Sequence, residues 1–483
     1  MTVGKSLLFE TLAETFEKLE STTKRLELTD HLVDLLKKLP IDDLDRAVYL
    51  VQGKICPDYV GVELGVAEKL AIKAVSMSSG IPEGRVELDM KSTGDLGETG
   101  QNMAEKKKQT ALFLERLTLE TVFDGFTKIA HATGYGSVDL KIKLLCSLLN
   151  NATPMEAKYI LRMVVGKLRL GVADMTVLDA LSIAYGGGKE AREALERAYN
   201  LSSDLGHVAR IVAEKGLKGL RKFRVTIGRP IRPMLAERLS SAEEILEKIG
   251  GKGAAEYKYD GLRLQAHISP SKTTLFSRRL ENVSSQFPDA AEGIRTSLSA
   301  GEAIVEGECI AVDPYTGEML PFQMISQRRG RKYEVERMAI EVPVSVFIFD
   351  ILYADGVDYT VHAYPERRRN LTRILSETER VKLSHQIVTD DPSEIERYMD
   401  QAISEGCEGL VVKSVGPDSV YKAGARGWSW IKYKREYKSE MTDAVDLVVV
   451  GALYGRGRRA GTYGALLLAA YDHDEDLFRT ICK

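Results

Sequence analysis

The sequence lacks the features that would place it in a membrane or build a cysteine-based site. No stretch approaches the roughly 18 consecutive apolar residues that a membrane-spanning helix needs, and the first residues mix charged with apolar side chains instead of forming a signal peptide. The five cysteines stand singly without a CxxC pair, so neither a zinc ribbon nor a dithiol redox site is expected. These absences predict a cytoplasmic protein with no membrane partner.

Charge is balanced over the whole chain but uneven along it. The 67 basic and 70 acidic residues leave a net charge of -3. Residues 214–232, however, contain seven cations and one anion, and residues 422–438 contain six cations and one anion. A third cluster comprises Arg328, Arg329, Arg331 and Lys332. Each cluster alone is typical of a solvated face, but three together favour a polyanionic partner.

Length and local pattern predict three folded units. At about 150 residues per domain, 483 residues allow roughly three domains. Helical periodicity prevails up to about Val225, and β-branched and aromatic runs prevail after it. We therefore predict an all-α unit over residues 1–225, an α+β unit with antiparallel strands over 226–437, and a third unit over 438–483. That last stretch holds about three strands, too few to close a five-stranded β-barrel, so we expect part of one.

Two helices of the first unit have clear end signals. Thr153, Pro154 and Glu156 supply an N-cap, a first-turn proline and a capping-box acid, which predict the start of a helix. An apolar stripe over residues 205–212 predicts another helix, which Gly216 closes.

The second unit contains a lysine in a setting suited to nucleophilic chemistry. The segment EYKYDGLR, residues 256–263, places Lys258 near the end of a predicted strand. Alone, it is more typical of a hairpin turn with an exposed lysine. Side chains two residues apart on a strand share a face, so each later strand can present a pair of groups to one pocket. The pairs are Glu306 with Glu308, Phe347 with Phe349, and Lys432 with Lys434.

Each pair also has a structural alternative: a solvated face for the glutamates, ordinary core for the phenylalanines, and protection of a sheet edge for the lysines. Their joint occurrence after Lys258 favours chemistry. An amine attacks only in its neutral form, which neighbouring cations and partial desolvation favour. Arg263, Lys432, Lys434 and a divalent metal are the expected sources of positive charge, and they would also hold phosphate oxygens.

The order and spacing of these segments resemble the nucleotidyltransferase motifs of ATP-dependent DNA ligases, most of all the archaeal and eukaryotic replicative type. The resemblance covers essentially the whole chain. It includes GDLG at 94–97, GKLRLG at 166–171, RPMLA at 232–236 and RGRRAGTYG at 456–464. It implies a helical DNA-binding domain over 1–225, an adenylation (nucleotidyltransferase) domain over 226–437, and an incomplete oligonucleotide-binding (OB-fold) domain over 438–483.

The family pattern also implies a role for each matching residue. Lys258 resembles the lysine that becomes adenylated, Glu256 the residue that reads the adenine, and Phe349 the ring that stacks on it. The other implied contacts are Arg263 and Arg278 with ribose and phosphate, Glu308 and Glu408 with ribose and metal, and Arg426, Lys432 and Lys434 with the triphosphate. Oxygen ligands of this kind fit Mg²⁺ better than zinc.

By that resemblance, Lys258 attacks the α-phosphate of ATP and releases pyrophosphate. AMP then passes to the 5′-phosphate of a nick in duplex DNA, and the 3′-hydroxyl displaces it, as DNA replication, repair and recombination require. An RNA ligase or a GTP-using capping enzyme would share this chemistry, and a non-catalytic nucleic-acid scaffold would need the basic clusters but not Lys258. The helical first unit favours duplex DNA, because encircling a nick needs extra phosphate-contacting surface, whereas the RNA ligase and the capping enzyme can work with a nucleotidyltransferase domain and smaller additions.

Two remaining features concern partners and the last residues. The stretch QTALF, from Gln109 to Phe113, is similar to the sliding-clamp-binding motif of archaeal ligases, or else it is a helix that buries Leu112 and Phe113. The family's last motif, a basic cluster that orients the leaving pyrophosphate, has no counterpart before Lys483. If the chain is the whole polypeptide, we expect impaired self-adenylation with the later steps less affected. We also expect a monomer.

Overall fold

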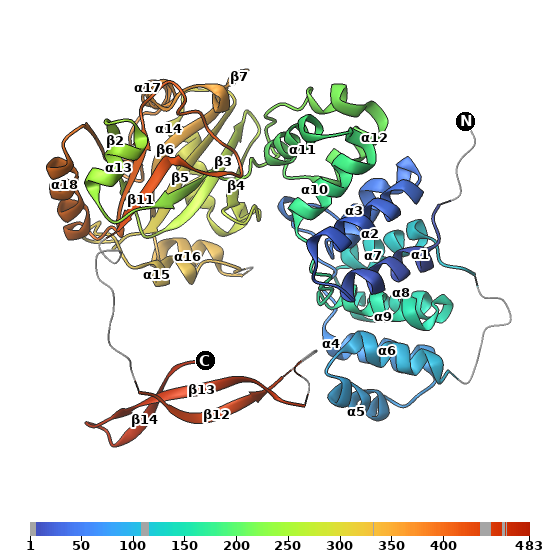
Figure 1. Ribbon diagram of the computed structural model, residues 1–483. Helices are drawn as coiled ribbons and strands as arrows, with labels where there is room; N and C mark the ends of the chain where they lie inside the picture. Colours follow the sequence, from blue (N-terminus) through green and yellow to red (C-terminus); the bar gives the residue numbers. More distant parts are fainter. Residues whose placement is uncertain (1–5, 108–114, 332, 435–445, 456–458, 460) are drawn as a thin grey trace.

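The computed structural model describes residues 6–107, 115–331, 333–434, 446–455, 459 and 461–483. Its elements form three groups (Figure 1). Those up to Leu220 make a helical region, those from Leu235 to Lys434 make a two-sheet region, and the last strands make a C-terminal sheet. The expected fold class, all-α followed by α+β with antiparallel strands and a partial β-barrel, is confirmed. No helix among the described residues is long and apolar enough to span a bilayer.

The helical region is built around one apolar core, in which Phe9, Leu12, Phe126 and Leu161 are fully buried. Its helices are α1 (Phe9–Glu20), α2 (Arg25–Lys38), α3 (Leu44–Val51), α4 (Glu68–Ser79), α5 (Glu83–Thr93), α6 (Leu96–Glu105), α7 (Leu119–His131), α8 (Ser137–Asn151), α9 (Pro154–Val164), α10 (Asp174–Leu181), α11 (Lys189–Ser202) and α12 (Leu205–Leu220). Shorter turns are η1 (Ile41–Asp43), η2 (Asp58–Val60) and η3 (Ser182–Gly186).

The predicted start of α9 is confirmed, whereas the helix predicted to close at Gly216 is interrupted there and continues beyond it. The hydroxyl of Thr153 accepts a hydrogen bond from Glu156 N at 3.3 Å, and Glu156 Oε2 accepts one from Thr153 N at 2.8 Å, which completes the capping box of α9. Gly216 interrupts α12 with a left-handed φ of 56°, a conformation that glycine adopts without strain. A further helical turn runs on to Leu220, so the glycine kinks the helix before its end.

The two-sheet region contains sheets in the orders β1-β11-β10-β2-β9 and β4-β3-β5-β6-β7, with β8 pairing with β6. Only β1 with β11 and β6 with β8 are parallel among the described pairs. The strands are β1 (Leu235–Arg238), β2 (Gly253–Lys258), β3 (Leu262–Ser269), β4 (Lys272–Ser277), β5 (Ala303–Ala311), β6 (Val344–Ala354), β7 (Val357–Asp358), β8 (Val381–Leu383), β9 (Gln386–Thr389), β10 (Gly409–Ser414) and β11 (Arg426–Lys434).

Helices cover the outer face of each sheet, and the inner faces of the two sheets pack against each other. The helices are α13 (Ala242–Ile249), α14 (Pro288–Ser297), α15 (Phe322–Ser326), α16 (Val335–Glu341), α17 (Tyr364–Ile374) and α18 (Pro392–Ser404), with the turns η4 (Ser284–Gln286) and η5 (Tyr359–Val361). Ile245 of α13 and Ile395 of α18 pack on Leu410 of β10. Between the sheets, Ile304 and Phe349 of the second sheet pack with Trp430 of the first. The polar residues of the inner faces therefore face one another.

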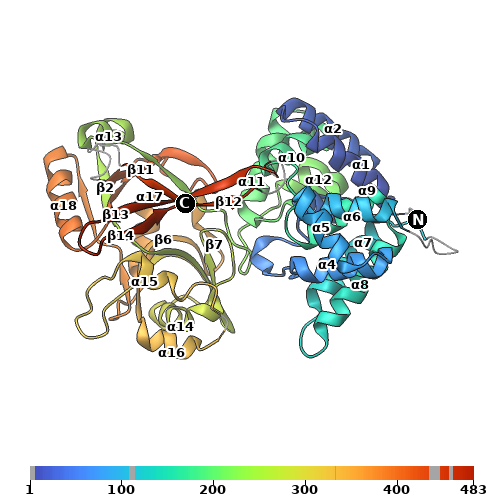
Figure 2. The same ribbon diagram turned by 90° about the horizontal axis from the view of Figure 1, so that it is seen from below.

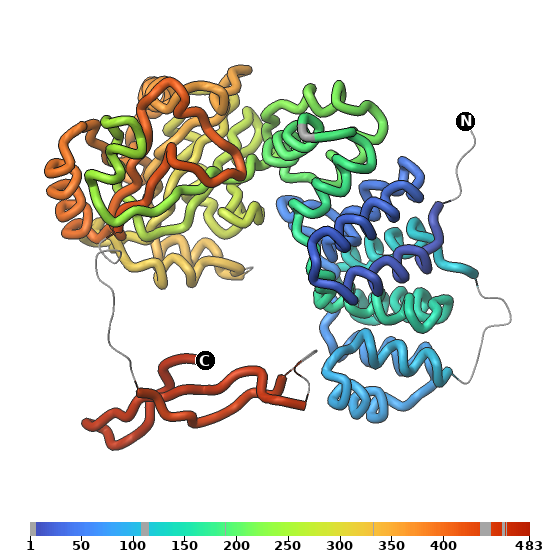
Figure 3. Tube along the Cα trace, in the orientation of Figure 1, coloured from blue at the N-terminus to red at the C-terminus, as the bar shows by residue number. Residues whose placement is uncertain are grey.

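The helical region and the two-sheet region lie side by side in two perpendicular views (Figures 1 and 2). Residues 225–234, which we call the linker, connect α12 to β1. The C-terminal sheet consists of β12 (Val448–Tyr454), β13 (Tyr463–Asp472) and β14 (Leu477–Cys482), paired antiparallel in that order. It lies apart from the other two groups along the chain trace (Figure 3). Part of the RGRRAGTYG segment lies outside the described residues.

Candidate active site

A cavity of about 370 Å³ opens between the facing sheets. Nine of the ten predicted site residues line it: Glu256, Lys258, Arg263, Arg278, Glu308, Phe349, Glu408, Arg426 and Lys432. The tenth, Lys434, is tied to the cavity through an ion pair of 2.6 Å with Glu408. Residues from seven separate segments thus meet at one place, as the alternation of side chains along the strands predicted.

Strand register explains why two of the lysines lie close together. Gly409 of β10 pairs with Lys258 of β2 on one side and with Lys434 of β11 on the other. Residues directly opposite one another in a sheet project to the same face, so both lysines point into the site. Gly409 has a φ of 144°, and a Cβ there would lie only 2.3 Å from Tyr433 O. Glycine is therefore required between the two lysines.

The direct partner of Lys258 is a carboxylate. Its ammonium group donates to Glu408, and Glu408 also accepts from Lys434. Burial by itself raises the pKa of Glu408, but its bonds with the two lysines outweigh burial and hold that pKa at about 2. The Lys258 side chain is therefore held by Glu408 and would have to leave this carboxylate before it could contact another group.

The expected cluster of cations is also present. Burial lowers the pKa of Lys432, and Lys258, Arg426 and Arg278 lower it further. Like charges disfavour one another's charged forms, so this shift reports their proximity. Groups of this kind bind phosphate oxygens well, because an added anion relieves the repulsion among them.

Other carboxyl groups also lie close to Lys258. Burial raises the pKa of Glu308 to about 7, although Lys258 and Arg263 oppose the rise. Burial and a hydrogen bond with Glu408 also raise the pKa of Asp260. Oxygen donors at Glu308 and Glu408 fit a hard cation such as Mg²⁺. Among the described residues, no group of three or more His, Cys, Asp or Glu side chains forms a complete metal cage, and Mg²⁺ usually takes ligands from water and phosphates as well.

Aromatic rings form one wall of the cavity. Phe349 of β6 and Trp430 of β11 meet edge to face, with ring centroids 6.1 Å apart. The guanidinium carbon of Arg263 lies 5.4 Å from the Phe349 ring and 5.6 Å from the Trp430 ring. Such a wall suits a flat heterocycle next to cationic groups.

One buried lysine at the site was missed by the sequence analysis. Lys413 of β10 is only 1% exposed, and its Nζ contacts Glu256 Oε2 at 2.7 Å and Phe349 O at 3.2 Å. Tyr364 donates to the other oxygen of Glu256. The carboxylate of Glu256 is therefore already saturated from two sides. The available signal was alternation, since Lys413 lies on the face of β10 that Gly409 presents to the cavity.

One of the three predicted basic clusters is not wholly at the surface. Arg328 is 1% exposed and makes two bonds with Asp289, at 2.5 and 2.9 Å. Arg329 lines the cavity and Arg331 is exposed. The expectation of a solvated basic face is therefore wrong for Arg328, whose charge is neutralised inside the protein.

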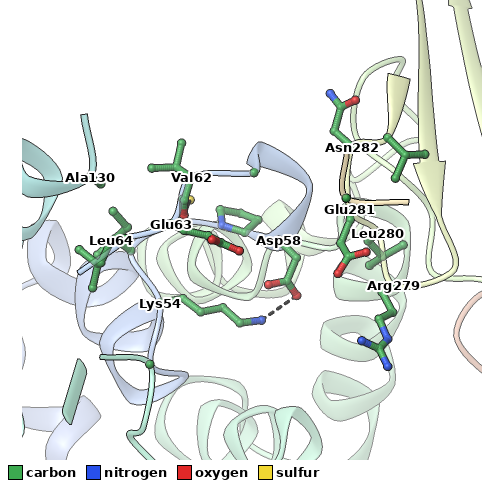
Figure 4. Close-up of a pocket in the computed structure, with 18 of the residues that line it drawn as sticks. Lys54, Asp58, Val62, Glu63, Leu64, Ala130, Arg279, Leu280, Glu281 and Asn282 are labelled. Atoms are coloured by element: carbon green, nitrogen blue, oxygen red, sulfur yellow. Dashed lines mark hydrogen bonds and ion pairs between the residues drawn. The ribbon is translucent and has the colours of Figure 1, made fainter. Parts of the chain in front are cut away.

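A larger cleft of about 1980 Å³ separates the helical region from the two-sheet region (Figure 4). In that view, the segment around Lys54 and Asp58 faces Arg279 and Glu281 across the cleft, and Lys54 is paired with Asp58 at 2.7 Å. Cations contributed by both regions line it: Lys54, Lys141, Arg232, Arg278, Arg279, Arg329 and Arg331. Arg278, Arg279 and Arg329 also line the smaller cavity, so the two spaces share one wall.

Comparison with known proteins identifies the family. Residues 233–434 match the ATP dependent DNA ligase domain, and residues 8–182 match the DNA ligase N terminus. The chain belongs to the ATP-dependent DNA ligase family. It is 49% identical to the DNA ligase of Staphylothermus marinus, over 98% of this chain and 81% of that protein. It is 50% identical to DNA ligase 2 of Thermofilum pendens, over 100% of this chain and 81% of that protein.

The fold agrees with this assignment to the DNA ligases. The solved structure "Pmar-Lig_PreS3" matches 97% of this chain and 87% of its own with a TM-score of 0.53, although only 15% of residues are identical. As a family member, the chain is an enzyme that seals nicks in duplex DNA and uses ATP with a divalent metal such as Mg²⁺. An RNA ligase, a capping enzyme and a non-catalytic scaffold are not favoured.

Proposed function

We propose that Lys258 is the residue that accepts AMP from ATP, in the cavity between the two sheets. The observation that carries the proposal is the convergence of the family's motif residues on that cavity, with Lys258 close to the carboxyl groups of Glu308 and Glu408 and to the cation of Lys432. Its Nζ attacks the α-phosphorus, the bond from that phosphorus to the bridging oxygen breaks, and pyrophosphate leaves. The amine must lose its proton for this step.

The aromatic wall is the proposed seat of the adenine. Phe349 would stack on the base, with Trp430 supporting the ring from its edge. Glu256 is saturated by Lys413 and Tyr364, so we propose that it holds the base-binding end of the cavity in shape and reads the adenine mainly through its backbone. Arg263, stacked over Phe349, is assigned to the ribose side.

Phosphates are assigned to the cationic side of the cavity. Arg426 and Lys432 lie on β11, and Arg278 follows β4, so cations from two segments can hold the triphosphate at once. Lys434 remains paired with Glu408 when Lys258 leaves that carboxylate. Charge that grows on the phosphate oxygens during transfer is stabilised by cations already in place.

Glu308 and Glu408 are the proposed metal ligands. When bound there, Mg²⁺ would supply Lewis-acid activation of the phosphate and neutralise its charge. The protein's own contribution is to hold both carboxylates beside Lys258. Because metals bind ionised carboxylates, the raised pKa of Glu308 means that the site must also displace a proton from it near neutral pH.

We further propose the domain division 1–225, 226–437 and 438–483, with nicked DNA held along the cleft that the helical and two-sheet regions share. The cations on both sides of the cleft support this placement, since phosphate contacts supply most of the affinity for DNA. We also propose that the protein is cytoplasmic. We propose that it is a monomer, since all the residues that line the cavity come from one chain. The proposed clamp-binding segment, Gln109 to Phe113, lies outside the described residues and remains a sequence-based proposal.

Replacement of the nucleophile tests the proposed function. Lys258→Ala should abolish nick sealing and retain binding to nicked duplex DNA, measured by ligation on a gel and by fluorescence anisotropy. Lys413→Ala is less suitable, because removing a buried ion-pair partner also destabilises the fold. Sealing by Lys258→Ala at the wild-type rate would rule out the assignment.

A further inference from the structure

A row of buried polar side chains runs along β3 from the nucleotide cavity to the linker. Arg263, Gln265 and His267 alternate along the strand, so all three project from its inner face. Arg263 lines the cavity, whereas Gln265 and His267 are 4% and 1% exposed and do not line it. Neither Gln265 nor His267 belongs to the motif residues assigned above. Buried polar groups are costly unless they are bonded, so their partners show what they hold.

Gln265 uses all four of its hydrogen-bonding positions. Its Oε1 accepts from Ile231 N at 2.7 Å and from His267 at 2.9 Å, and its Nε2 donates to Ile231 O at 3.0 Å and to Glu306 Oε1 at 3.3 Å. Two of these bonds hold the backbone of Ile231, one through its N–H and one through its carbonyl oxygen. The remaining two extend the row in both directions along the inner face.

His267 also forms a hydrogen bond with the linker. Its Nδ1 accepts from Gly228 N at 3.0 Å, so the proton of the neutral ring lies on Nε2, which donates to Gln265. Burial lowers the pKa of His267 to about 3, which keeps the ring neutral at physiological pH. The direction of each bond in the row is therefore fixed.

At its other end the row reaches the nucleotide cavity. Glu306 accepts from Gln265 with one oxygen, and with the other it accepts from Arg263 at 2.8 Å and from Tyr421 at 2.8 Å. Arg263 in turn donates to Met234 O at 2.9 Å, the last linker residue, and stacks over the ring that we assign to adenine. Linker positions 228, 231 and 234 are thus all bonded to the inner face of the two-sheet region.

Two intervening linker positions are bonded to the helical region, and one of them, Arg232, also accepts from Gly424 N of the two-sheet region at 3.0 Å. Pro230 O accepts from Ser203 Oγ at 2.6 Å, and Arg232 N donates to Asn200 O at 2.8 Å. The guanidinium of Arg232 also donates to Tyr199 Oη at 2.6 Å. The linker is therefore held from two sides, by the helical region at positions 230 and 232 and by the inner face of β3 at 228, 231 and 234.

We propose that Gln265 and His267 are positioning residues of the ligase, which lock the linker onto the inner face of β3 next to the nucleotide cavity and thereby hold Arg263 in place for ATP. The proposal rests on the assignment of that cavity to ATP. Loss of Gln265 would leave Ile231 N and O unpaired. It would also leave one oxygen of Glu306 without its donor, and that oxygen would then draw the Arg263 guanidinium out of its present position. Loss of His267 would release Gly228 but leave the bond between Gln265 and Glu306 intact.

The test measures lysyl-AMP formation and linker exchange in the full chain. Gln265→Leu should raise the KM for ATP by about tenfold while kcat changes less than about twofold, because Arg263 binds the nucleotide without taking part in bond making. His267→Leu should raise KM only a few-fold. In both variants, mass-spectrometric hydrogen exchange should show faster exchange of linker amides, at Ile231 for the first and at Gly228 for the second.

Ile268→Val provides the matched control, because Ile268 lies on the opposite face of the same strand, buried in the outer core. It should lower the thermal midpoint and leave both KM and linker exchange unchanged. An unchanged KM in Gln265→Leu, unchanged linker exchange, or a larger KM effect for His267→Leu than for Gln265→Leu would each overturn the proposal. Failure of the proposed function looks different, since the wild-type chain would then form no adduct on Lys258.

Discussion

Lys258 and Glu408 are joined twice, through backbone and side chain. Glu408 N donates to Lys258 O at 2.9 Å, and the Lys258 ammonium donates to the Glu408 carboxylate. The backbone bond keeps the two side chains adjacent when the ion pair opens. Lys434, 2.6 Å from the same carboxylate, remains as its partner. The proposed nucleophile thus lies in an ion pair with Glu408, which must open before the proposed attack.

We expect Glu408→Gln to slow lysyl-AMP formation by roughly two orders of magnitude, equivalent to about 3 kcal/mol, because a neutral amide neither binds a divalent cation well nor holds Lys434. Single-turnover labelling with ATP measures this rate. Glu405→Gln is the matched control, since Glu405 bonds with Tyr257 and does not line the cavity. Equal rates for the two variants would contradict the role given to Glu408.

Glu308 should make stability depend on pH. Its folded pKa of about 7 lies above the ordinary 4.5, so the folded state binds the proton more tightly than the unfolded state does. The free energy of unfolding should therefore fall as pH rises from about 4.5 to about 7, and then level off. Denaturant unfolding across this range, without metal, should show a weaker fall for Glu308→Gln. Glu302→Gln, at a position that directly precedes β5 and does not line the cavity, should keep the wild-type slope; an identical slope in all three proteins would refute the assignment.

Arg328 should matter for stability and little for DNA. Because Arg328→Ala leaves Asp289 buried without its partner, we expect the free energy of unfolding to drop by about 3 to 5 kcal/mol. The exposed Arg331→Ala should change it by less than about 0.5 kcal/mol. Urea unfolding of both variants decides the matter, and comparable stabilities would show that the buried pair contributes little.

DNA binding along the cleft should respond to salt. Arg279 is exposed and lines both the cleft and the cavity, so Arg279→Ala should lower the slope of log K against log salt by about 0.9, the loss of one phosphate contact. Arg295→Ala removes a cation that pairs with Glu292 on α14 and lines neither space, and should leave the slope unchanged. Titrations of nicked duplex at several salt concentrations give the slopes; a change that is the same for both arginines would place the DNA elsewhere.

Local signals in the sequence predicted much of the fold. The capping box of Thr153 and Glu156 and the break at Gly216 depend on neighbouring residues alone, so they were readable in advance. Convergence of the site followed from alternation along strands together with the family resemblance, because each strand can present only one face to a shared cavity.

Partners that lie far apart in the sequence were not predictable in this way. Arg328 looked like a surface cation because Asp289, 39 residues earlier, gives no local sign that it will bury the charge. Lys413 was passed over since its partner Glu256 comes from another strand. The ion pair of Lys258 with Glu408 spans 150 residues, and the sequence pattern gave no sign that this carboxylate would be the direct partner of the lysine. Such contacts depend on sheet order, which residue patterns do not specify.

The most direct test of the central claim is to incubate the chain with Mg²⁺ and radiolabelled ATP, with GTP and NAD in parallel, and to map the labelled peptide by mass spectrometry. The account predicts a single AMP on Lys258, formed from ATP and lost on addition of nicked DNA as the strands are joined. Label on another residue, or an adduct on Lys258 that nicked DNA does not discharge, would contradict it.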